Sequence, residues 1–357
     1  MQLNVLVLPG DGIGTEVTRE AVRVLERVAS RFSHSLKLTE GLLGGVAIHK
    51  TGTPFPDATA ALAQDADATL LGAVGLPEFD NAPPSQRPER GLLGIRAALG
   101  VYANLRPVRT YAALIDSSPL KNHLVEGTDM IIVRELTGGI YYGTPRGIEG
   151  DSAVNTMAYS RPEIDRIARM AFELASKRRK KVASVDKSNV LECSQLWRKV
   201  VTEVAADYPD VELEHILVDN CAMQLVLNPR RFDVVVTENM FGDILSDEGA
   251  VLAGSIGMLP SASIGGKKPS GAWVGLYEPV HGSAPDIAGQ NKANPLGAIG
   301  SVAAMLEYSF GLLDEAKAVT AAMETVLNSG RVTADLKPAG PPATTEQVGQ
   351  AVCDAIG

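Results

Sequence analysis

The sequence predicts an α/β protein with a largely parallel sheet, and two observations support that prediction. Short runs of apolar and β-branched residues alternate along the chain with longer segments whose apolar residues recur at helical spacing. Charged residues stand at or just after the end of several apolar runs, among them Arg134, Lys187, Asp219 and Glu238. Binding groups collect at the carboxyl ends of strands in open α/β sheets, so this recurrence also predicts a ligand site.

The N-terminal third of the chain supplies two predicted strands and one clear helix. Residues 3–10 form an apolar run that ends at Gly10, and residues 68–75 form a second one. Between them, we expect a helix from about Thr15 to Ser30, whose apolar residues at helical spacing are Val17, Ala21, Val24, Leu25 and Val28. The second strand enters a proline-rich loop over residues 76–90.

The central part repeats the alternation of strands and helices. Apolar runs predict strands at residues 129–135, 180–187 and 232–239. Residues 162–180 predict a helix, since Pro162 stands near its first turn and its end is basic. A further helix is expected from residue 243 to about residue 254, directly after the third of these strands.

Composition limits the class of protein. The chain has 357 residues, of which 45% are hydrophobic and 21% charged, which is ordinary for a soluble protein with room for two domains. A net charge of -9 argues against nucleic acid as a partner. No uniformly apolar window of bilayer thickness and no signal peptide are apparent, and three cysteines without metal-type spacing fit reduced thiols, so we expect a cytoplasmic protein without membrane contact.

Two carboxylates stand within an apolar stretch. Asp243 and Asp247 are four residues apart, so on a helix they project from one face, where like charges repel. They can form a solvated acidic face, which needs no partner, or bind a divalent cation such as Mg²⁺. An acidic pair alone favours the solvated face, so the pattern leaves both interpretations open.

Two other segments indicate a bound cofactor without a dinucleotide fingerprint. Gly10, Gly12 and Gly14 do not follow the G-x-G-x-x-G spacing, so they predict a tight turn and not a Rossmann site. Residues 276–295 form a long polar segment without apolar periodicity, and its Asn, Ser and acidic residues suit the binding of an adenosine.

Basic and phenolic side chains supply candidates for substrate binding and proton transfer. Arg96, Arg106 and Arg134 would suit a dicarboxylate if they converged, although each alone is more often a surface residue. Lys187 at a strand end and Tyr141 between glycine turns can transfer protons, or can simply be solvated or packed.

Several long motifs occur in a fixed order: "LPGDGIGTEV", "ANLRPV", "RELTGGIYYG", "SVDKSNVL", "VDNCAMQLV", "TENMFGDILSDE", "GSIGMLPSAS" and "YEPVHGSAPDIAGQNKANP". Together they resemble the β-decarboxylating hydroxyacid dehydrogenases, the isocitrate/isopropylmalate dehydrogenase family, over essentially the whole chain. The resemblance implies an α/β fold of two domains with an interdomain cleft, which is not a Rossmann fold. Residues 1–101 plus 254–357 would form a discontinuous nucleotide-binding domain, and residues 102–253 a central domain with the metal and substrate residues and the dimer interface.

The resemblance also implies site residues. Arg96, Arg106 and Arg134 would hold the two carboxylates of the substrate, and Lys187 and Tyr141 would transfer protons. Asp219, Asp243 and Asp247 would ligate Mg²⁺ or Mn²⁺, with Lys187 and Asp219 supplied by the partner subunit of a homodimer that shares its active sites. The NAD site would be lined by Ile13, Glu278, His281, Gly282, Ser283, Ala284, Asp286, Ile287 and Asn294.

The implied reaction is the NAD-dependent oxidative decarboxylation of 3-isopropylmalate in leucine biosynthesis. Glu89, Leu92, Leu93 and Val190 would face the group on C3 of the substrate, and aliphatic side chains there suit an apolar substituent better than a third carboxylate. Asp286 before Ile287 favours NAD over NADP, because a carboxylate repels a 2′-phosphate. Isocitrate, homoisocitrate and tartrate stay open as substrates, as does a non-catalytic two-domain binding protein.

Overall fold

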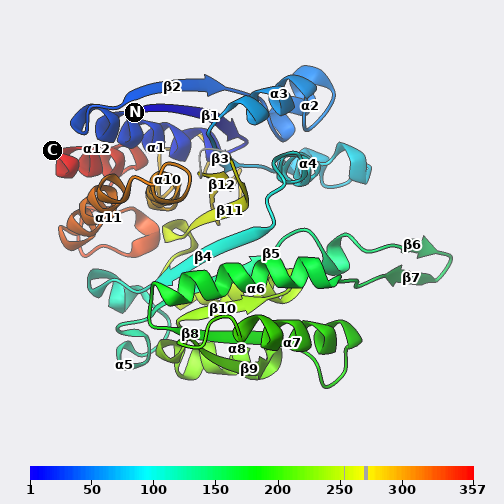
Figure 1. The fold of residues 1–357 in the computed structure, drawn as a ribbon. Coiled ribbons are helices and arrows are strands. Elements are labelled where there is room, and N and C mark those ends of the chain that lie inside the picture. Colours follow the sequence, from blue (N-terminus) through cyan, green and yellow to red (C-terminus); the bar gives the residue numbers. More distant parts are fainter. Residues whose placement is uncertain (253, 269–271) are drawn as a thin grey trace. The chain divides into compact units, whose positions relative to one another are not determined.

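The computed structural model describes residues 1–252, 254–268 and 272–357. Its chain forms two compact units, each with a sheet and helices (Figure 1). Unit 1 combines Met1–Val101 with Gly254–Gly357, and unit 2 is Tyr102–Ala253. Both units are α/β, as the sequence predicts.

The sheet of unit 1 has the strand order β2-β1-β3-β12-β11. These strands are β1 (Gln2–Gly10), β2 (Ser35–Glu40), β3 (Ala68–Ala73), β11 (Pro260–Lys267) and β12 (Trp273–Pro279). β1 pairs in parallel with β2 and β3, and β3 pairs in parallel with β12, whereas β11 runs antiparallel to β12. The carboxyl ends of β1, β3 and β12 therefore lie along one edge of this sheet.

The helices of unit 1 pack on its sheet or on one another. They are α1 (Gly14–Arg31), α2 (Gly45–Thr51), α3 (Asp57–Asp65), α4 (Glu89–Leu99), α10 (Leu296–Tyr308), α11 (Leu313–Asn328) and α12 (Thr345–Ile356). Leu6, Leu8 and Leu71 of the strands form one buried cluster with Ala63 of α3 and Ile95 of α4. On the other side, α1 and α10 contact β3 and pack with α11 and α12.

The sheet of unit 2 has the order β4-β5-β10-β8-β9. The strands are β4 (Ala103–Arg109), β5 (Asp129–Glu135), β8 (Lys181–Asp186), β9 (Glu212–Leu217) and β10 (Val234–Thr237). β5, β10, β8 and β9 pair in parallel, and β4 is antiparallel to β5. Parallel pairing brings the ends of β5, β8 and β10 to one edge, where the sequence places Arg134, Lys187 and Glu238.

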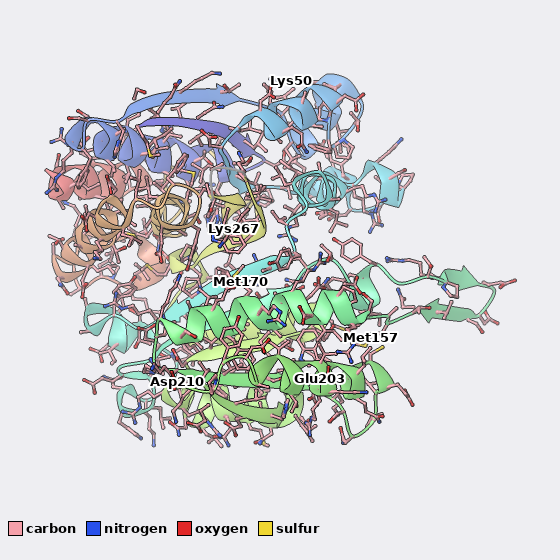
Figure 2. All side chains as sticks on the ribbon, in the orientation of Figure 1. Lys50, Met157, Met170, Glu203, Asp210 and Lys267 are labelled. Carbon is pink, nitrogen blue, oxygen red and sulfur yellow. The ribbon has the colours of Figure 1, made fainter. Side chains whose placement is uncertain are left out.

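Helices α6 (Arg161–Ser176) and α7 (Glu192–Ala205) pack against the sheet of unit 2. Met170 of α6 is buried, whereas Glu203 of α7 is exposed (both labelled in Figure 2). The remaining helices are α5 (Asn122–Val125), α8 (Val218–Leu227) and α9 (Asn239–Leu252). Leu225 of α8 and Leu245 of α9 join Ile132 and Val185 of the strands in a buried cluster. A short two-stranded arm, β6 (Arg146–Glu149) and β7 (Ser152–Asn155), is exposed along its length and extends from this unit (Figure 1).

Three sequence predictions need correction. The helix expected over residues 162–180 ends at Ser176, so the basic residues 177–180 that predicted its end lie beyond its last turn. The helix expected from residue 243 begins one turn earlier, at Asn239, because the Glu238 carboxylate accepts hydrogen bonds from the backbone N–H groups of Met240 and Phe241 and so caps the helix. The polar segment 276–295 is not loop throughout, since its first four residues belong to β12. Glu278 is therefore a strand residue.

Candidate functional site

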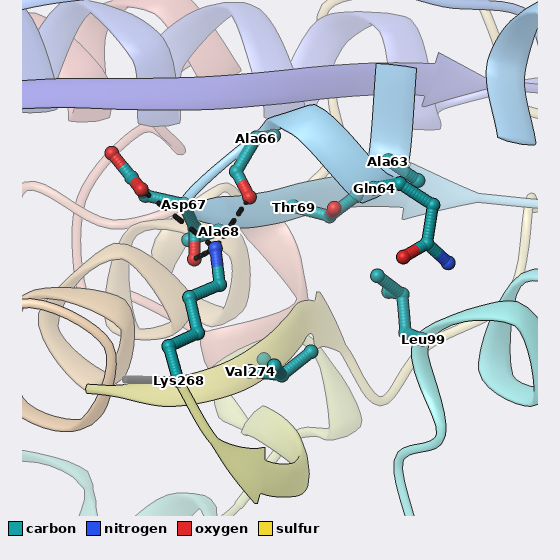
Figure 3. Close-up of a pocket in the computed structure, with 10 residues that line it drawn as sticks. Ala63, Gln64, Ala66, Asp67, Ala68, Thr69, Leu99, Lys268 and Val274 are labelled. Carbon is teal, nitrogen blue, oxygen red and sulfur yellow. Dashed lines mark hydrogen bonds and ion pairs between the residues drawn. The ribbon is translucent and has the colours of Figure 1, made fainter. Parts of the chain in front are cut away.

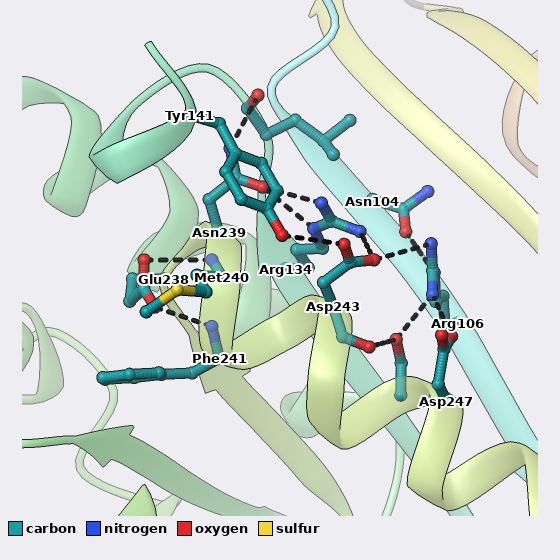
Figure 4. Close-up of polar contacts among 12 residues, drawn as sticks. Asn104, Arg106, Arg134, Tyr141, Glu238, Asn239, Met240, Phe241, Asp243 and Asp247 are labelled. Carbon is teal, nitrogen blue, oxygen red and sulfur yellow. Dashed lines mark hydrogen bonds and ion pairs between the residues drawn. The ribbon is translucent and has the colours of Figure 1, made fainter. Parts of the chain in front are cut away.

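Four charged side chains of unit 2 form a cluster (Figure 4). Arg106 of β4 contacts both acids of α9, with Nη1 3.2 Å from Asp247 Oδ1 and Nη2 3.7 Å from Asp243 Oδ1. Arg134 of β5 forms an ion pair with Asp243 through Nη1. The sequence left open what offsets the repulsion between Asp243 and Asp247, and in this structure the two arginines do.

Burial distinguishes the two kinds of charge in this cluster. The Arg106 and Arg134 side chains are 10% and 5% exposed, whereas those of Asp243 and Asp247 are 35% and 62% exposed. The arginines are thus fixed in the protein and the carboxylates are open to solvent. Carboxylate oxygens are the ligands that Mg²⁺ and Mn²⁺ prefer, and on α9 they stand four residues apart on one face, so the donor set fits a hard divalent cation.

Tyr141 joins the cluster from the turn Gly139–Tyr141, and its hydroxyl donates a 3.0 Å hydrogen bond to Asp243 Oδ2. Burial, together with the neighbouring Asp243 carboxylate, raises the pKa of this phenol above its ordinary value. The phenol therefore stays protonated at neutral pH and can act as a proton donor. Gly138 and Gly139 precede it, and a Cβ on either would overlap the ring of Tyr159.

Asn104 and Asn239 are two buried amides that sequence reasoning missed. Asn239 Oδ1 accepts hydrogen bonds from Arg134 Nε and Nη2, and Asn104 Oδ1 accepts one from Arg106 Nε. Asn239 was detectable, because it precedes Asp243 by four residues and Asp247 by eight and so shares their face of α9. Asn104 carried no comparable signal.

Lys187 lies directly after β8, and its Nζ is 2.8 Å from Oδ1 of Asp219 on α8. The hydrogen bond from Lys187 lowers the pKa of Asp219. The backbone around Lys187 is fixed by Ser194, whose hydroxyl accepts from Lys187 N, and by the buried Asp186, which binds Arg198 through two hydrogen bonds. Within the described ranges of this single chain, no three His, Cys, Asp or Glu side chains are grouped closely enough to hold a metal ion.

In unit 1 the glycine turn after β1 contacts the segment that follows β12. Ile13 N donates a 2.8 Å hydrogen bond to Ser283 O. A Cβ on Gly12 would stand 2.1 Å from that same oxygen, and Gly12 has a φ of +55°, so only glycine fits there. The two segments that the sequence singled out for a cofactor are thus in direct contact.

Two buried nitrogens in unit 1 lack partners among the described residues. His281 Nε2 is buried without a hydrogen bond, and burial lowers the pKa of this imidazole, which keeps it neutral. Arg96 Nε is likewise buried and without a hydrogen bond, while Arg96 Nη2 is 2.7 Å from Glu278 Oε1. Such unsatisfied donors and acceptors are uncommon in folded proteins, and they fit a polar ligand such as a nucleotide.

The remaining predicted residues are distributed over both units. On α4, Glu89, Leu92, Leu93 and Arg96 share one face by their spacing. Val190 is exposed in the turn after Lys187. Around His281, Gly282 and Asp286 are exposed and Ala284 and Ile287 are half-buried. The amide of Asn294 is engaged within unit 1, by Asp335 and by the backbone N–H of Leu296.

A separate pocket of about 350 Å³ lies in unit 1 beside β3 and β12 (Figure 3). Lys268 reaches across it and donates to Ala66 O at 2.7 Å and to Asp67 O at 3.3 Å. None of the residues that the sequence singled out lines this pocket. Across the described residues, no helix has the length and apolar character needed to cross a membrane.

Comparisons with known proteins agree along the whole chain. The family model "Isocitrate/isopropylmalate dehydrogenase" matches residues 4–352. A 3-isopropylmalate dehydrogenase of Priestia megaterium is 57% identical over 100% of this chain and 96% of its own length. One of Geobacillus kaustophilus is 59% identical over 94% of this chain and 90% of its own length.

Solved structures show the same fold. An isocitrate dehydrogenase from Methylococcus capsulatus superimposes with a TM-score of 0.87 at 35% identity, and covers 99% of each chain. A β-decarboxylating dehydrogenase from Thermococcus kodakarensis gives a TM-score of 0.81 at 36% identity, over 99% of this chain and 96% of its own.

Proposed function

The chain belongs to the isocitrate/isopropylmalate dehydrogenase family, and from this premise we propose that it oxidatively decarboxylates 3-isopropylmalate to 4-methyl-2-oxopentanoate and CO₂ with NAD and Mg²⁺ or Mn²⁺. The observation that carries the proposal is identity of 57% and 59% over almost the whole chain to two proteins named 3-isopropylmalate dehydrogenase. The isocitrate dehydrogenase of similar fold is 35% identical, which favours the isopropylmalate branch. The pathway would be leucine biosynthesis.

The charge cluster supports the handling of a dicarboxylate. Arg106 and Arg134 would hold substrate carboxylates, with Arg96 contributing from α4, since guanidinium groups bind carboxylates through paired hydrogen bonds. Asp243 and Asp247 would then exchange their arginine partners for a divalent cation, whose bound charge stabilises negative charge as it develops on the substrate. Leu92 and Leu93, on the same face of α4 as Arg96, would face the isopropyl group.

Two side chains would transfer protons. Lys187, directly or through water, would take the proton of the C2 hydroxyl while a hydride leaves C2, and bound NAD supplies the hydride acceptor. The resulting 2-oxo acid loses its β-carboxylate as CO₂, and the electrons of the broken C–C bond form an enolate. Tyr141, which the raised phenol pKa keeps protonated, would then protonate the enol carbon.

Residues of unit 1 support an NAD site. The contact between the Ile13 turn and Ser283 and the unpartnered His281 Nε2 fit a nucleotide bound there. The exposed Asp286 would accept hydrogen bonds from the ribose hydroxyls, and its negative charge would repel the 2′-phosphate of NADP. The other residues proposed to line the NAD site are Glu278, Gly282, Ala284, Ile287 and Asn294.

We also propose a cytoplasmic homodimer with shared sites. Apolar side chains are exposed on neighbouring helices of unit 2, with Leu227 of α8 60% exposed and Ile244 of α9 59% exposed. The β6–β7 arm exposes Ile148 at 84%. Exposed apolar groups of this kind are typical of subunit interfaces. Since the described residues of one chain gather no three-residue metal cluster, a partner's Asp219 would complete the ligand set.

The test is a direct assay. Purified protein mixed with 3-isopropylmalate, NAD and Mg²⁺ should produce NADH, measured by absorbance, and kcat/KM should exceed the values for isocitrate, homoisocitrate and tartrate. A preference for isocitrate would overturn the substrate assignment. Ligand binding without any NADH would instead support the binding protein.

Sharing of the sites has its own test. Lys187→Met and Tyr141→Phe subunits are each expected to be inactive as homodimers. After mixing and exchange, one site of each mixed dimer would be intact, and about a quarter of the unmodified activity should return. An inert mixture, with mixed dimers shown by native mass spectrometry, would contradict sharing.

A further inference from the structure

We propose that Asn104 and Asn239 are positioning residues that aim the guanidinium groups of Arg106 and Arg134 without neutralising them. Both arginines would thereby keep their full positive charge for the carboxylates of a dicarboxylate substrate. The inference rests on the proposed function, because it assigns a role behind the proposed substrate-binding arginines.

Asn239 uses its whole side-chain amide. Oδ1 accepts from Arg134 Nη2 at 2.8 Å and Nε at 3.0 Å, and Nδ2 donates to Gly138 O at 3.1 Å and Leu136 O at 3.2 Å. Because arginine only donates and a carbonyl only accepts, the amide has one orientation that satisfies all four bonds. Asn239 is 1% exposed and contacts none of the reacting groups, so it acts through Arg134 and through the turn that leads to Tyr141.

Asn104 does the same for the other arginine. Its Oδ1 accepts from Arg106 Nε at 2.8 Å, and the side chain is fully buried on β4. In both cases the amide holds the guanidinium through Nε, on one edge. Nη1 of each arginine then points to an acid of α9, Asp247 for Arg106 and Asp243 for Arg134. A substrate carboxylate would replace these acids as the partner of the arginines.

The choice of amide over carboxylate has a physical reason. A buried arginine is usually paired with an acid, and such a pair fixes the guanidinium but cancels its charge. Within the cluster, the two arginines already face Asp243 and Asp247. A further carboxylate behind either arginine would leave a negative excess and would weaken the attraction for an anionic substrate. A neutral amide supplies the same acceptor geometry without that cost.

Isosteric replacement tests the idea. Asn239→Asp and Asn104→Asp keep an oxygen acceptor for the arginine and add one negative charge. We expect the KM for 3-isopropylmalate to rise about tenfold in each, with the KM for NAD within about twofold of the unmodified value. Because the local positive charge is partly cancelled, KM should also depend less steeply on salt concentration.

Two comparison variants separate charge from structure. Asn122→Asp places the same charge change on the exposed α5 helix of unit 2 and should leave both KM values within twofold. Asn239→Ala removes the hydrogen bonds that position Arg134 without adding charge. The KM for 3-isopropylmalate should therefore rise, while the dependence of that KM on salt stays as in the unmodified enzyme. Melting temperatures show which variants fold, and Asn104→Asp keeps the test valid if substitution at Asn239 disturbs the turn.

The outcomes are distinct. Asp variants that fold and keep the KM of Asn122→Asp would overturn the inference, as would a KM for NAD that rises in step with that for 3-isopropylmalate, since that indicates general structural damage. Failure of the proposed function is recognised separately, because the unmodified protein and Asn122→Asp would then show no turnover at all.

Discussion

Asp11 in unit 1 and Asp243 in unit 2 each accept several hydrogen bonds or ion pairs, but from backbone groups in the first case and from side chains in the second. In unit 1, Asp11 is 3% exposed and accepts hydrogen bonds of 2.8 Å from three backbone N–H groups, those of Gly45, Val46 and Gly75. In unit 2, Asp243 is partnered by side chains, the guanidinium groups of Arg134 and Arg106 and the hydroxyl of Tyr141.

The difference indicates which site can exchange partners. Backbone N–H groups belong to the fold, so Asp11 cannot release them without disrupting the loops around it. Side chains can rotate, so Asp243 can release an arginine to a substrate and accept a cation in its place. We infer that unit 1 offers a preformed surface and that the charge cluster of unit 2 rearranges when ligands bind.

The largest expected effect is a loss of kcat on substitution of Lys187, the proposed proton acceptor in unit 2. Lys187→Met should lower kcat at least about 1,000-fold, because the proton acceptor for the C2 hydroxyl is lost. NAD affinity, measured by fluorescence quenching or calorimetry, should stay within twofold, since the proposed coenzyme residues lie in unit 1. Retained turnover would remove Lys187 from the proton-transfer role.

The two carboxylates can be compared directly. Asp243→Asn should raise the Mn²⁺ concentration needed for half-maximal activity about 10- to 100-fold, because a ligand loses its charge. It should also lower the melting temperature, because the buried Arg134 and Arg106 lose their ion pairs with Asp243. Asp11→Asn should leave the Mn²⁺ titration unchanged and lower stability by about 1–3 kcal/mol through loss of charge-assisted hydrogen bonds from the backbone. Mn²⁺ titrations and denaturant unfolding of both variants give the comparison. An unchanged titration for Asp243→Asn would contradict metal ligation.

A smaller effect is expected on substitution of Gly12, in the turn of unit 1 that contacts Ser283. In Gly12→Ala the new Cβ would stand 2.1 Å from Ser283 O at a φ of +55°, so the turn must shift. We expect the KM for NAD to rise about tenfold and stability to fall by about 1–3 kcal/mol. Gly330→Ala, with a φ of +71° and open space around it, carries the conformational cost alone. Equal effects of both substitutions on the KM for NAD would argue against a preformed coenzyme surface.

The sequence was informative where periodicity or spacing is local. The predicted strand at 68–75 and the helix from Thr15 to Ser30 are confirmed as β3 and α1, because their apolar residues follow strand and helix patterns strongly. α10 was not predicted as a helix. It is buried on nearly all sides, so its apolar residues show no amphipathic pattern from which a helix could be recognised.

Partners far apart in sequence could not be predicted from spacing. Arg134 and Asp243 are 109 residues apart, and only the folded chain shows that they form an ion pair. The start of α9 was missed for a related reason, because its cap is a glutamate, which is not one of the usual N-cap residues. The roles assigned to the site residues stay predictions.

The smallest expected effect is a pH-dependent change in melting temperature at Glu238. Like Asp11 in unit 1, this carboxylate of unit 2 accepts hydrogen bonds from backbone N–H groups. The Glu238 carboxylate accepts hydrogen bonds from Met240 N at 3.1 Å and Phe241 N at 2.6 Å, yet burial raises the pKa of this carboxyl above its ordinary value. The folded state therefore holds this proton more tightly than the unfolded state. The contribution to stability is complete below the pKa of the unfolded chain and is lost as pH rises through the higher pKa of the folded protein. Glu238→Gln removes this dependence, and relative to the unmodified protein its melting temperature should increase by about 2–4 °C between acidic and neutral pH. Glu203→Gln should show a small trend of the opposite sign, because the hydrogen bond from Arg161 lowers the pKa of this exposed carboxyl. Parallel curves for Glu238→Gln and the unmodified protein would mean that the backbone N–H groups already offset the cost of burying the Glu238 charge.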